Sequence, residues 1–75
     1  MIKLSELKVG ESGKIVQIFY DNKLSKRLMQ LGFNVGQTVK ILSISSLKKS
    51  YLISIRHYAI ALRKDCLNLI GVEKL

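Results

Sequence analysis

The side chains that could ligate a transition metal are few and scattered in this sequence. The chain contains one histidine, His57, one cysteine, Cys66, and five acidic residues. A site for ferrous or zinc ion needs imidazole, thiolate or carboxylate groups that converge on one point. His57 and Cys66 stand nine positions apart, on either side of an expected strand. We therefore expect no metal site and no cofactor, with His57 in a turn and Cys66 buried as a small apolar side chain.

The single histidine and the single cysteine also give little support for covalent catalysis. A cysteine or serine nucleophile needs a neighbouring base and a third group that orients this base. His57 is the single imidazole in the chain. A phosphate-binding loop of the P-loop type ends in Lys-Ser or Lys-Thr, whereas Gly13 and Lys14 are followed by Ile15. The sequence predicts a protein that is not an enzyme and that binds no nucleotide by this route.

The chain is strongly basic, with 13 lysines and arginines against five acids and a formal net charge of +8. Such a charge attracts acidic partners over long range, and these include nucleic acids, membrane surfaces and acidic proteins. The basic residues are spread along the whole chain and form no basic tail. A solvated cationic surface without a specific partner is the simpler explanation of the charge.

Hydropathy and cysteine content indicate a compartment. The longest apolar run covers residues 58–62, far below the roughly 20 residues of a membrane span, so no direct membrane insertion is expected. Polar residues interrupt the N-terminal segment, which therefore lacks the hydrophobic region of a signal peptide. A lone cysteine cannot form an internal disulfide, and this favours a reducing compartment. The sequence predicts a cytoplasmic protein.

The length of 75 residues permits one core, so we expect a single domain over residues 1–75. The residue pattern predicts one helical turn over residues 4–7 and short strands dense in β-branched and aromatic residues. We expect these strands at residues 14–20, 38–45, 51–56, 58–62 and 69–72. A small bent sheet that closes on itself would remove exposed strand edges. We therefore predict an all-β fold, a small five-stranded barrel with one short inserted helix.

The inserted helix is expected over residues 22–31. Leu24, Leu28 and Leu31 recur at helical spacing and share one face, while Lys23, Lys26, Arg27 and Gln30 occupy the outer side. Asp21 or Asn22 can cap the first turn. Gly32 stands where a left-handed residue ends a helix, which would fold Phe33 back onto Leu28.

Three segments of the chain resemble the ferrous iron transport protein A (FeoA) family, and their order and spacing cover most of the sequence. They are residues 4–11 (LSELKVGE), 27–36 (RLMQLGFNVG) and 58–64 (YAIALRK). The resemblance implies an SH3-like barrel and a cytosolic accessory protein of FeoB, a membrane transporter for ferrous iron with a GTP-binding domain. The sequence departs from the family in two places. Lys48, Lys49 and Ser50 replace a loop with glycine or proline, and His57 stands where a turn glycine is common.

A docking face for the cytoplasmic part of a FeoB-type transporter can be predicted on the helix and the barrel rim. Met29 points away from the leucine stripe and has basic neighbours, which suits a surface that adapts to an acidic partner. The alternative is that Met29 covers a strand edge as part of the core. A second possible docking face is a rim formed by Lys48, Lys49 and His57. The candidate partner-binding residues are Lys26, Arg27, Met29, Gln30, Lys48, Lys49 and His57.

The sequence leaves two other functions open. A small basic barrel that binds nucleic acid needs aromatic side chains for stacking beside its cations, and Tyr51, Tyr58, Arg56 and Lys49 are the candidates. The tyrosines fit better as half-buried strand residues, so no specific nucleic acid is expected. The fold also resembles the regulatory module of iron-responsive repressors. That module normally follows DNA-binding and dimerisation domains, whereas this chain starts with the fold itself at Met1. The oligomeric state is left open.

Overall fold

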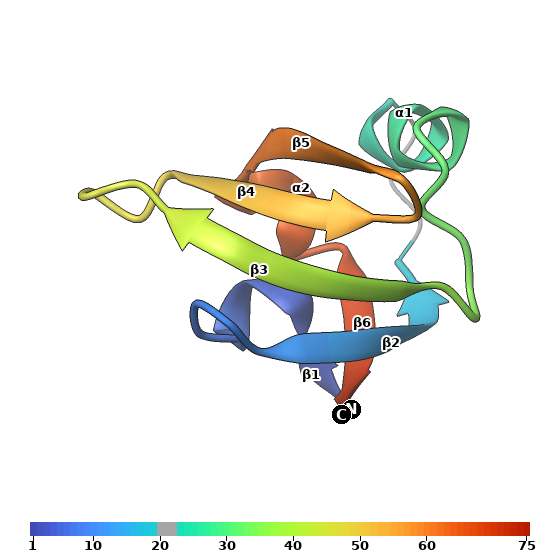
Figure 1. Cartoon of the computed structure of the whole chain (residues 1–75). Helices are drawn as coiled ribbons and strands as arrows, with labels where there is room; N and C mark the ends of the chain where they lie inside the picture. Colours follow the sequence, from blue (N-terminus) through green and yellow to red (C-terminus); the bar gives the residue numbers. More distant parts are fainter. Residues whose placement is uncertain (20–22) are drawn as a thin grey trace.

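Antiparallel strands are the main secondary structure of the computed structural model, which describes residues 1–19 and 23–75 (Figure 1). The sheet has six strands in the order β1-β6-β2-β3-β4-β5. The strands are β1 (Ile2–Lys3), β2 (Ser12–Ile18), β3 (Thr38–Ile44), β4 (Ser50–Ile55), β5 (Tyr58–Arg63) and β6 (Ile70–Lys74). The prediction of a small, mostly β fold is confirmed. The expected count of five strands is wrong, because it lacks β1. At two residues, β1 is too short to show an alternating pattern.

The sheet does not close by strand pairing. In residues 1–19 and 23–75, β1 pairs only with β6 and β5 pairs only with β4, so β1 and β5 are the two edges. Two short helical segments, η1 (Leu4–Glu6) and α2 (Lys64–Leu67), contact each other instead. The hydroxyl of Ser5 donates a 2.5 Å hydrogen bond to the Asn68 side chain just after α2. We expected strand pairing to close the sheet. In the structure, the contact between η1 and α2 joins the two ends of the sheet instead.

The turn η1 matches the helical turn expected over residues 4–7, and it buries both Leu4 and Leu7. The segment α2 was not expected, because four residues are too few to show helical periodicity. Register shifts in β2, between Ile15 and Gln17, and in β3, between Ile41 and Ser43, bend these strands. The bend allows a sheet of few strands to surround one core.

The helix α1 (Leu24–Gln30) is the inserted helix that the leucine spacing predicts. Its expected start at residue 22 and the caps Asp21 and Asn22 lie outside the described residues. Leu28 is buried at 1% exposure, whereas Leu24 and Leu31 are half-buried and Ser25 is buried beside Leu28. The predicted leucine face is therefore buried mainly at Leu28, which anchors the helix to the core.

The end of α1 forms a Schellman motif. Gly32 adopts a positive φ of 98°, as predicted, and its N–H donates to the Met29 carbonyl at 3.1 Å. The Phe33 N–H donates to the Leu28 carbonyl at 3.0 Å, and both side chains are buried. This motif turns the chain sharply and delivers Phe33, the largest fully buried side chain, into the core.

The core collects apolar side chains from all strands except β1, from α1 and α2, and from η1. Its buried members are Leu4, Leu7, Ile15, Leu28, Phe33, Val39, Ile41, Tyr51, Ile53, Ile55, Leu62, Leu67, Ile70 and Val72. Within the described ranges, no helix has the length and apolar character needed to cross a bilayer.

Candidate functional site

The outer face of α1 presents the side chains that the sequence assigns to a docking face. Lys26, Arg27, Met29 and Gln30 are all exposed. Met29 is 46% exposed while the adjacent Leu28 is 1% exposed, so Met29 belongs to the surface and not to the core. Lys26, Arg27 and Gln30, together with Lys23 and Leu31, line an open pocket of about 510 Å³. An apolar side chain therefore stands beside a basic depression.

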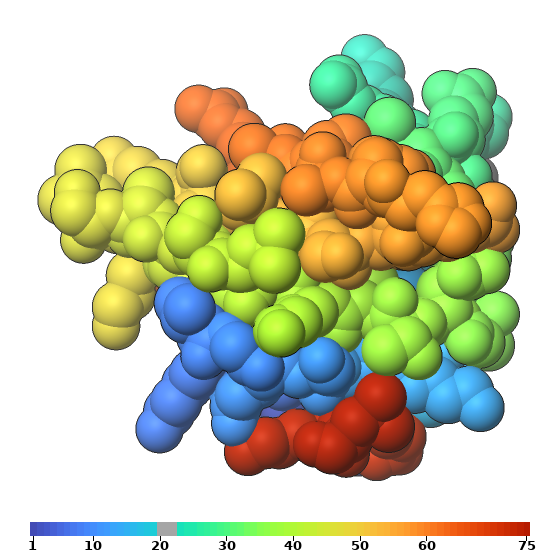
Figure 2. All heavy atoms as spheres, viewed as in Figure 1, coloured from blue at the N-terminus to red at the C-terminus, as the bar shows by residue number. Residues whose placement is uncertain are grey.

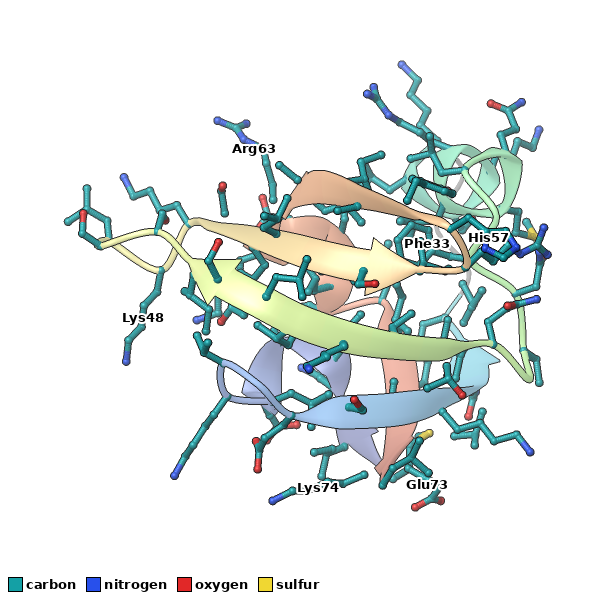
Figure 3. All side chains as sticks on the ribbon, viewed as in Figure 1. Phe33, Lys48, His57, Arg63, Glu73 and Lys74 are labelled. Atoms are coloured by element: carbon teal, nitrogen blue, oxygen red, sulfur yellow. The ribbon has the colours of Figure 1, made fainter. Side chains whose placement is uncertain are left out.

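The turn between β4 and β5 holds His57 close to the end of α1. The Tyr58 hydroxyl donates a hydrogen bond to the Leu31 carbonyl, the residue that follows α1. His57 precedes Tyr58 in the same turn and lies at this end of the sheet in Figure 3. The residue with positive φ in the turn is Arg56, at 54°. The position that favours glycine is thus Arg56 and not His57.

The turn between β3 and β4 carries Lys48 and Lys49 at the other end of the sheet. The Ser45 Oγ organises this turn by accepting hydrogen bonds from the backbone N–H groups of Lys49 and Ser50, at 3.1 and 3.2 Å. Lys48 has a positive φ of 56°, so it occupies a backbone position that favours glycine. The turn projects from the molecule in Figure 2, far from α1.

The structure therefore separates the candidate residues into two groups. Lys48 and Lys49 precede β4 while His57 follows it, and six strand residues at about 3.3 Å each hold the two ends roughly 20 Å apart. The expected rim of Lys48, Lys49 and His57 is not one continuous surface. His57 lies instead with α1, and we call Lys26, Arg27, Met29, Gln30 and His57 the helix surface.

A second basic pocket surrounds Lys48 and Lys49. It has a volume of about 310 Å³, and Arg63, Lys64 and Asp65 complete its lining. The Lys64 N–H donates to the Lys49 carbonyl at 2.9 Å, which fixes the start of α2 against the β3–β4 turn. We call Lys48, Lys49, Arg63 and Lys64 the turn cluster. Arg63 and Lys64 were not among the candidate residues, although a two-residue turn at residues 56–57 already implies that Ser50 faces Arg63.

Cys66 lies in α2 between the two basic groups. It is half-buried and packs against the core. Burial raises the pKa of the Cys66 thiol, while the positive charges of Arg27 and Arg63 oppose this rise. The thiol is therefore held in its neutral form, and Arg27 and Arg63 both lie within electrostatic reach of it. Within residues 1–19 and 23–75, no three His, Cys, Asp or Glu side chains gather into a group that could hold a metal ion.

The two tyrosines considered for base stacking differ in their surroundings. Tyr51 is 3% exposed, and its hydroxyl donates a 3.0 Å hydrogen bond to the Ser5 carbonyl. Its ring is part of the core and presents no face to a base. Tyr58 is 42% exposed but is bonded to the end of α1. Of the two candidate rings, only Tyr58 is therefore exposed and open to stacking with a base.

Comparison with known proteins adds a family and a fold. The sequence model of one family, described as FeoA domain, matches residues 2–74. A protein of Porphyromonas gingivalis, named as a fusion of Fe(2+) transport protein A and Fe(2+) transporter FeoB, is 29% identical over 72 residues. These residues are 96% of this chain but only 8% of that relative's length.

Two solved structures are similar over almost the whole chain. A FeoA-like protein from Clostridium acetobutylicum is 26% identical and superposes with a TM-score of 0.93, covering 99% of this chain and 86% of that protein. The FeoA of Stenotrophomonas maltophilia, solved in complex with zinc and described as a prokaryotic SH3 domain protein, has a TM-score of 0.85. It is 23% identical and covers 97% and 91% of the two chains, so this likeness shows the SH3-like fold alone.

Proposed function

This chain belongs to the FeoA domain family, and on that premise we propose that it is a cytoplasmic accessory protein of a FeoB-type ferrous iron transporter. It modulates iron(II) uptake by binding the transporter's cytoplasmic part. It catalyses no reaction of its own. The family match supports a link to ferrous iron transport, and the adaptor role is our proposal.

The observation that carries the proposal is the fusion protein of Porphyromonas gingivalis, in which the two partners occupy one polypeptide. A covalent link holds two domains at a high effective concentration, which is useful when the domains act on each other. The same two units in separate chains must find each other by surface contact. This chain is the counterpart of a small part of that relative, and it has a surface suited to contact.

The helix surface fits this task by its chemistry. Met29 offers a flexible, polarizable apolar side chain that adapts to a partner's shape. Lys26, three residues before Met29, is its neighbour on the helix. Lys26 and Arg27 line the adjacent pocket and steer an acidic partner into contact, which raises the association rate. The Tyr58 hydrogen bond holds the helix end against the β4–β5 turn, so the helix surface is presented in one orientation.

A double substitution on the helix surface tests the proposal. Met29→Asp with Arg27→Glu removes the apolar contact and reverses one charge, while the buried Leu28 is untouched. The variant should keep its thermal midpoint within a few degrees, since exposed substitutions change stability by about 0.5 kcal/mol or less. It should no longer retain the transporter's cytoplasmic part in a pull-down, and it should not support iron uptake.

A matched control carries the same chemical changes on another surface. Val9→Asp with Lys8→Glu alters an exposed valine and a neighbouring lysine in the turn before β2. This control should bind the transporter normally. If the Met29 and Arg27 variant folds and binds as well as the control, the helix surface is not the docking face. If the unaltered protein instead retains RNA that is lost on adding salt, and no transporter, the basic surface acts as a non-specific cation and the proposal is wrong.

A further inference from the structure

The strand β5 leaves one side of its backbone without a strand partner. It is an edge of the sheet, and in the part of the chain that the structure describes it pairs with β4 alone. Natural proteins usually protect such edges with proline, charges pointing inward, or a covering element. The six residues of β5 contain no proline, and Ala59 and Ala61 in its middle are exposed. In Figure 1 this edge faces away from the rest of the sheet.

The register identifies which backbone groups are free. Lys64 donates its N–H to Lys49, so this position points toward β4. Hydrogen-bonded and non-bonded positions alternate along an antiparallel pair. The N–H and C=O groups of Ala59 and Ala61 therefore point away from β4, and no hydrogen bond is formed by them within residues 1–19 and 23–75. Their methyl side chains leave room for another backbone to approach.

Positive charge flanks this edge at both ends. The turn cluster lies at the Arg63 end, where Lys48, Lys49 and Lys64 surround the last residue of β5. The helix surface lies at the Tyr58 end, tied to β5 by the hydrogen bond to Leu31. Figure 3 shows Arg63 extending outward from the edge, on the side opposite His57. The edge therefore runs from one basic group to the other.

We propose that β5 is a docking edge for an extended acidic peptide segment, which adds to the sheet as a further strand and places its carboxylates on the helix surface and the turn cluster. Main-chain hydrogen bonds to Ala59 and Ala61 supply the pairing, as in other cases of strand addition. Charge selects the occupant, because a second copy of this chain would bring another +8 to the same edge. The segment belongs to the transporter's cytoplasmic part, so this proposal rests on the proposed function.

The test uses a labelled peptide with a core of alternating valine and threonine and a pair of glutamates at each end. Fluorescence anisotropy measures its binding to the full chain, and hydrogen exchange follows the amide protons of Ala59 and Ala61. We expect binding, with slower exchange at both amides. A peptide methylated on alternate core nitrogens cannot form the main-chain hydrogen bonds to β5. Its affinity should be at least about tenfold lower. A lysine version of the peptide should not bind.

Two protein variants separate pairing from charge. Ala61→Pro removes an N–H that β4 does not use, and it should weaken binding of the peptide about tenfold. Arg63→Gln with Lys64→Gln should weaken binding to a similar extent, about tenfold. The control Lys3→Gln with Lys8→Gln removes the same charge from other surfaces and should bind within about twofold of the unaltered protein. If Ala61→Pro fails to fold, the methylated peptide still tests the backbone pairing.

Other outcomes would overturn the proposal. Equal binding of the methylated peptide without amide protection would mean simple charge attraction. Binding of an RNA oligonucleotide that Ala61→Pro leaves unchanged, with no binding of the peptide, would make the basic groups a nucleic-acid surface. A concentration-dependent dimer that Ala61→Pro abolishes would make a second copy the occupant.

The same variants separate this proposal from the proposed function. If the unaltered protein and Ala61→Pro retain the transporter's cytoplasmic part equally, the edge is not used and the accessory role stands. If the peptide binds with amide protection but the transporter's cytoplasmic part is not retained, the edge is a docking site and the assigned partner is wrong.

Discussion

The Tyr58 hydroxyl donates a hydrogen bond to the carbonyl of Leu31, and this contact joins the β4–β5 turn to the end of α1. A helix end has carbonyl groups without intrahelical partners, so a side-chain donor stabilises it. Tyr58→Phe keeps the ring and removes the donor. We expect a loss of about 1 kcal/mol in unfolding free energy, with faster amide exchange in α1. Tyr51→Phe, which loses the bond to Ser5, is the comparison and should leave exchange in α1 unchanged relative to the rest of the domain.

Gly32 carries the sharp turn after α1, with φ of 98°. A Cβ at this position would lie 3.4 Å from the Tyr58 hydroxyl, which is ordinary contact, so the cost of a side chain comes from the backbone. Gly32→Val should lower the unfolding free energy by about 1–2 kcal/mol, measured by thermal or urea denaturation. Gly32→Asn should cost less, because asparagine tolerates the left-handed region. Equal stability of the valine variant and the parent would contradict this backbone assignment.

Arg56 adopts φ of 54° in the β4–β5 turn, although it is not glycine. Arg56→Gly should raise the unfolding free energy by about 0.5 kcal/mol, since relief of the left-handed strain exceeds the extra freedom of the unfolded chain. His57→Gly is the matched control. His57 has no positive φ, so glycine there should lower stability. The opposite order of the two variants would place the strained position at His57.

Glu11 ties the turn before β2 to the C-terminal strand. Its carboxylate lies 2.5 Å from the Lys74 Nζ and accepts a 2.7 Å hydrogen bond from the Lys8 N–H. The bond to Lys74, and then that to Lys8, holds the pKa of Glu11 below its usual value of 4.5. The contact therefore stabilises the fold above pH 4.5 and is lost as pH falls through the lower folded pKa.

Lys74→Gln should return the pKa of Glu11 toward 4.5 in a proton-detected titration. Lys40→Gln, which removes a charge from β3, should leave this pKa as it is in the parent. A Glu11 titration that is the same in the parent and in Lys74→Gln would show that the ion pair does not form in solution.

Metal removal should leave the protein intact. The described residues bring no three metal-binding side chains together, so we expect folding to proceed without a metal ion. Dialysis against a chelator should leave the thermal midpoint unchanged, and ferrous or zinc ion at equal concentration should not raise it. A large stabilisation by either ion would contradict the expectation, and His57→Ala would then test whether the one imidazole is involved.

The sequence was informative where a local pattern suffices. Leu28 at helical spacing, Gly32 after the helix and the β-branched runs each specify their own element, and all were found where predicted. The edges were not predictable in this way. The pairing of β1 and the bridge between η1 and α2 depend on contacts such as Ser5 with Asn68, 63 residues apart, which no local period reveals.

The same distinction applies to the candidate site. The exposure of Met29 followed from its angle on the helix. The grouping of Lys48 and Lys49 with Arg63 and Lys64 required the register of the β4–β5 hairpin, in which Ser50 faces Arg63. The separation of His57 from Lys48 follows from the length of β4, which the strand pattern at residues 51–56 already indicates.

The two ends of the chain meet at one corner of the molecule, because β1 pairs with β6 (Figure 1). Ile2 lies opposite Val72, and the amino group of Met1 is 3.8 Å from the Glu73 carboxylate. A host polypeptide therefore enters and leaves such a domain at nearly one point. The domain is suited to insertion into a surface loop of a larger protein without separating the ends of that loop. A circular permutant with joined termini, opened at the turn between β3 and β4, should keep every strand pair of the sheet.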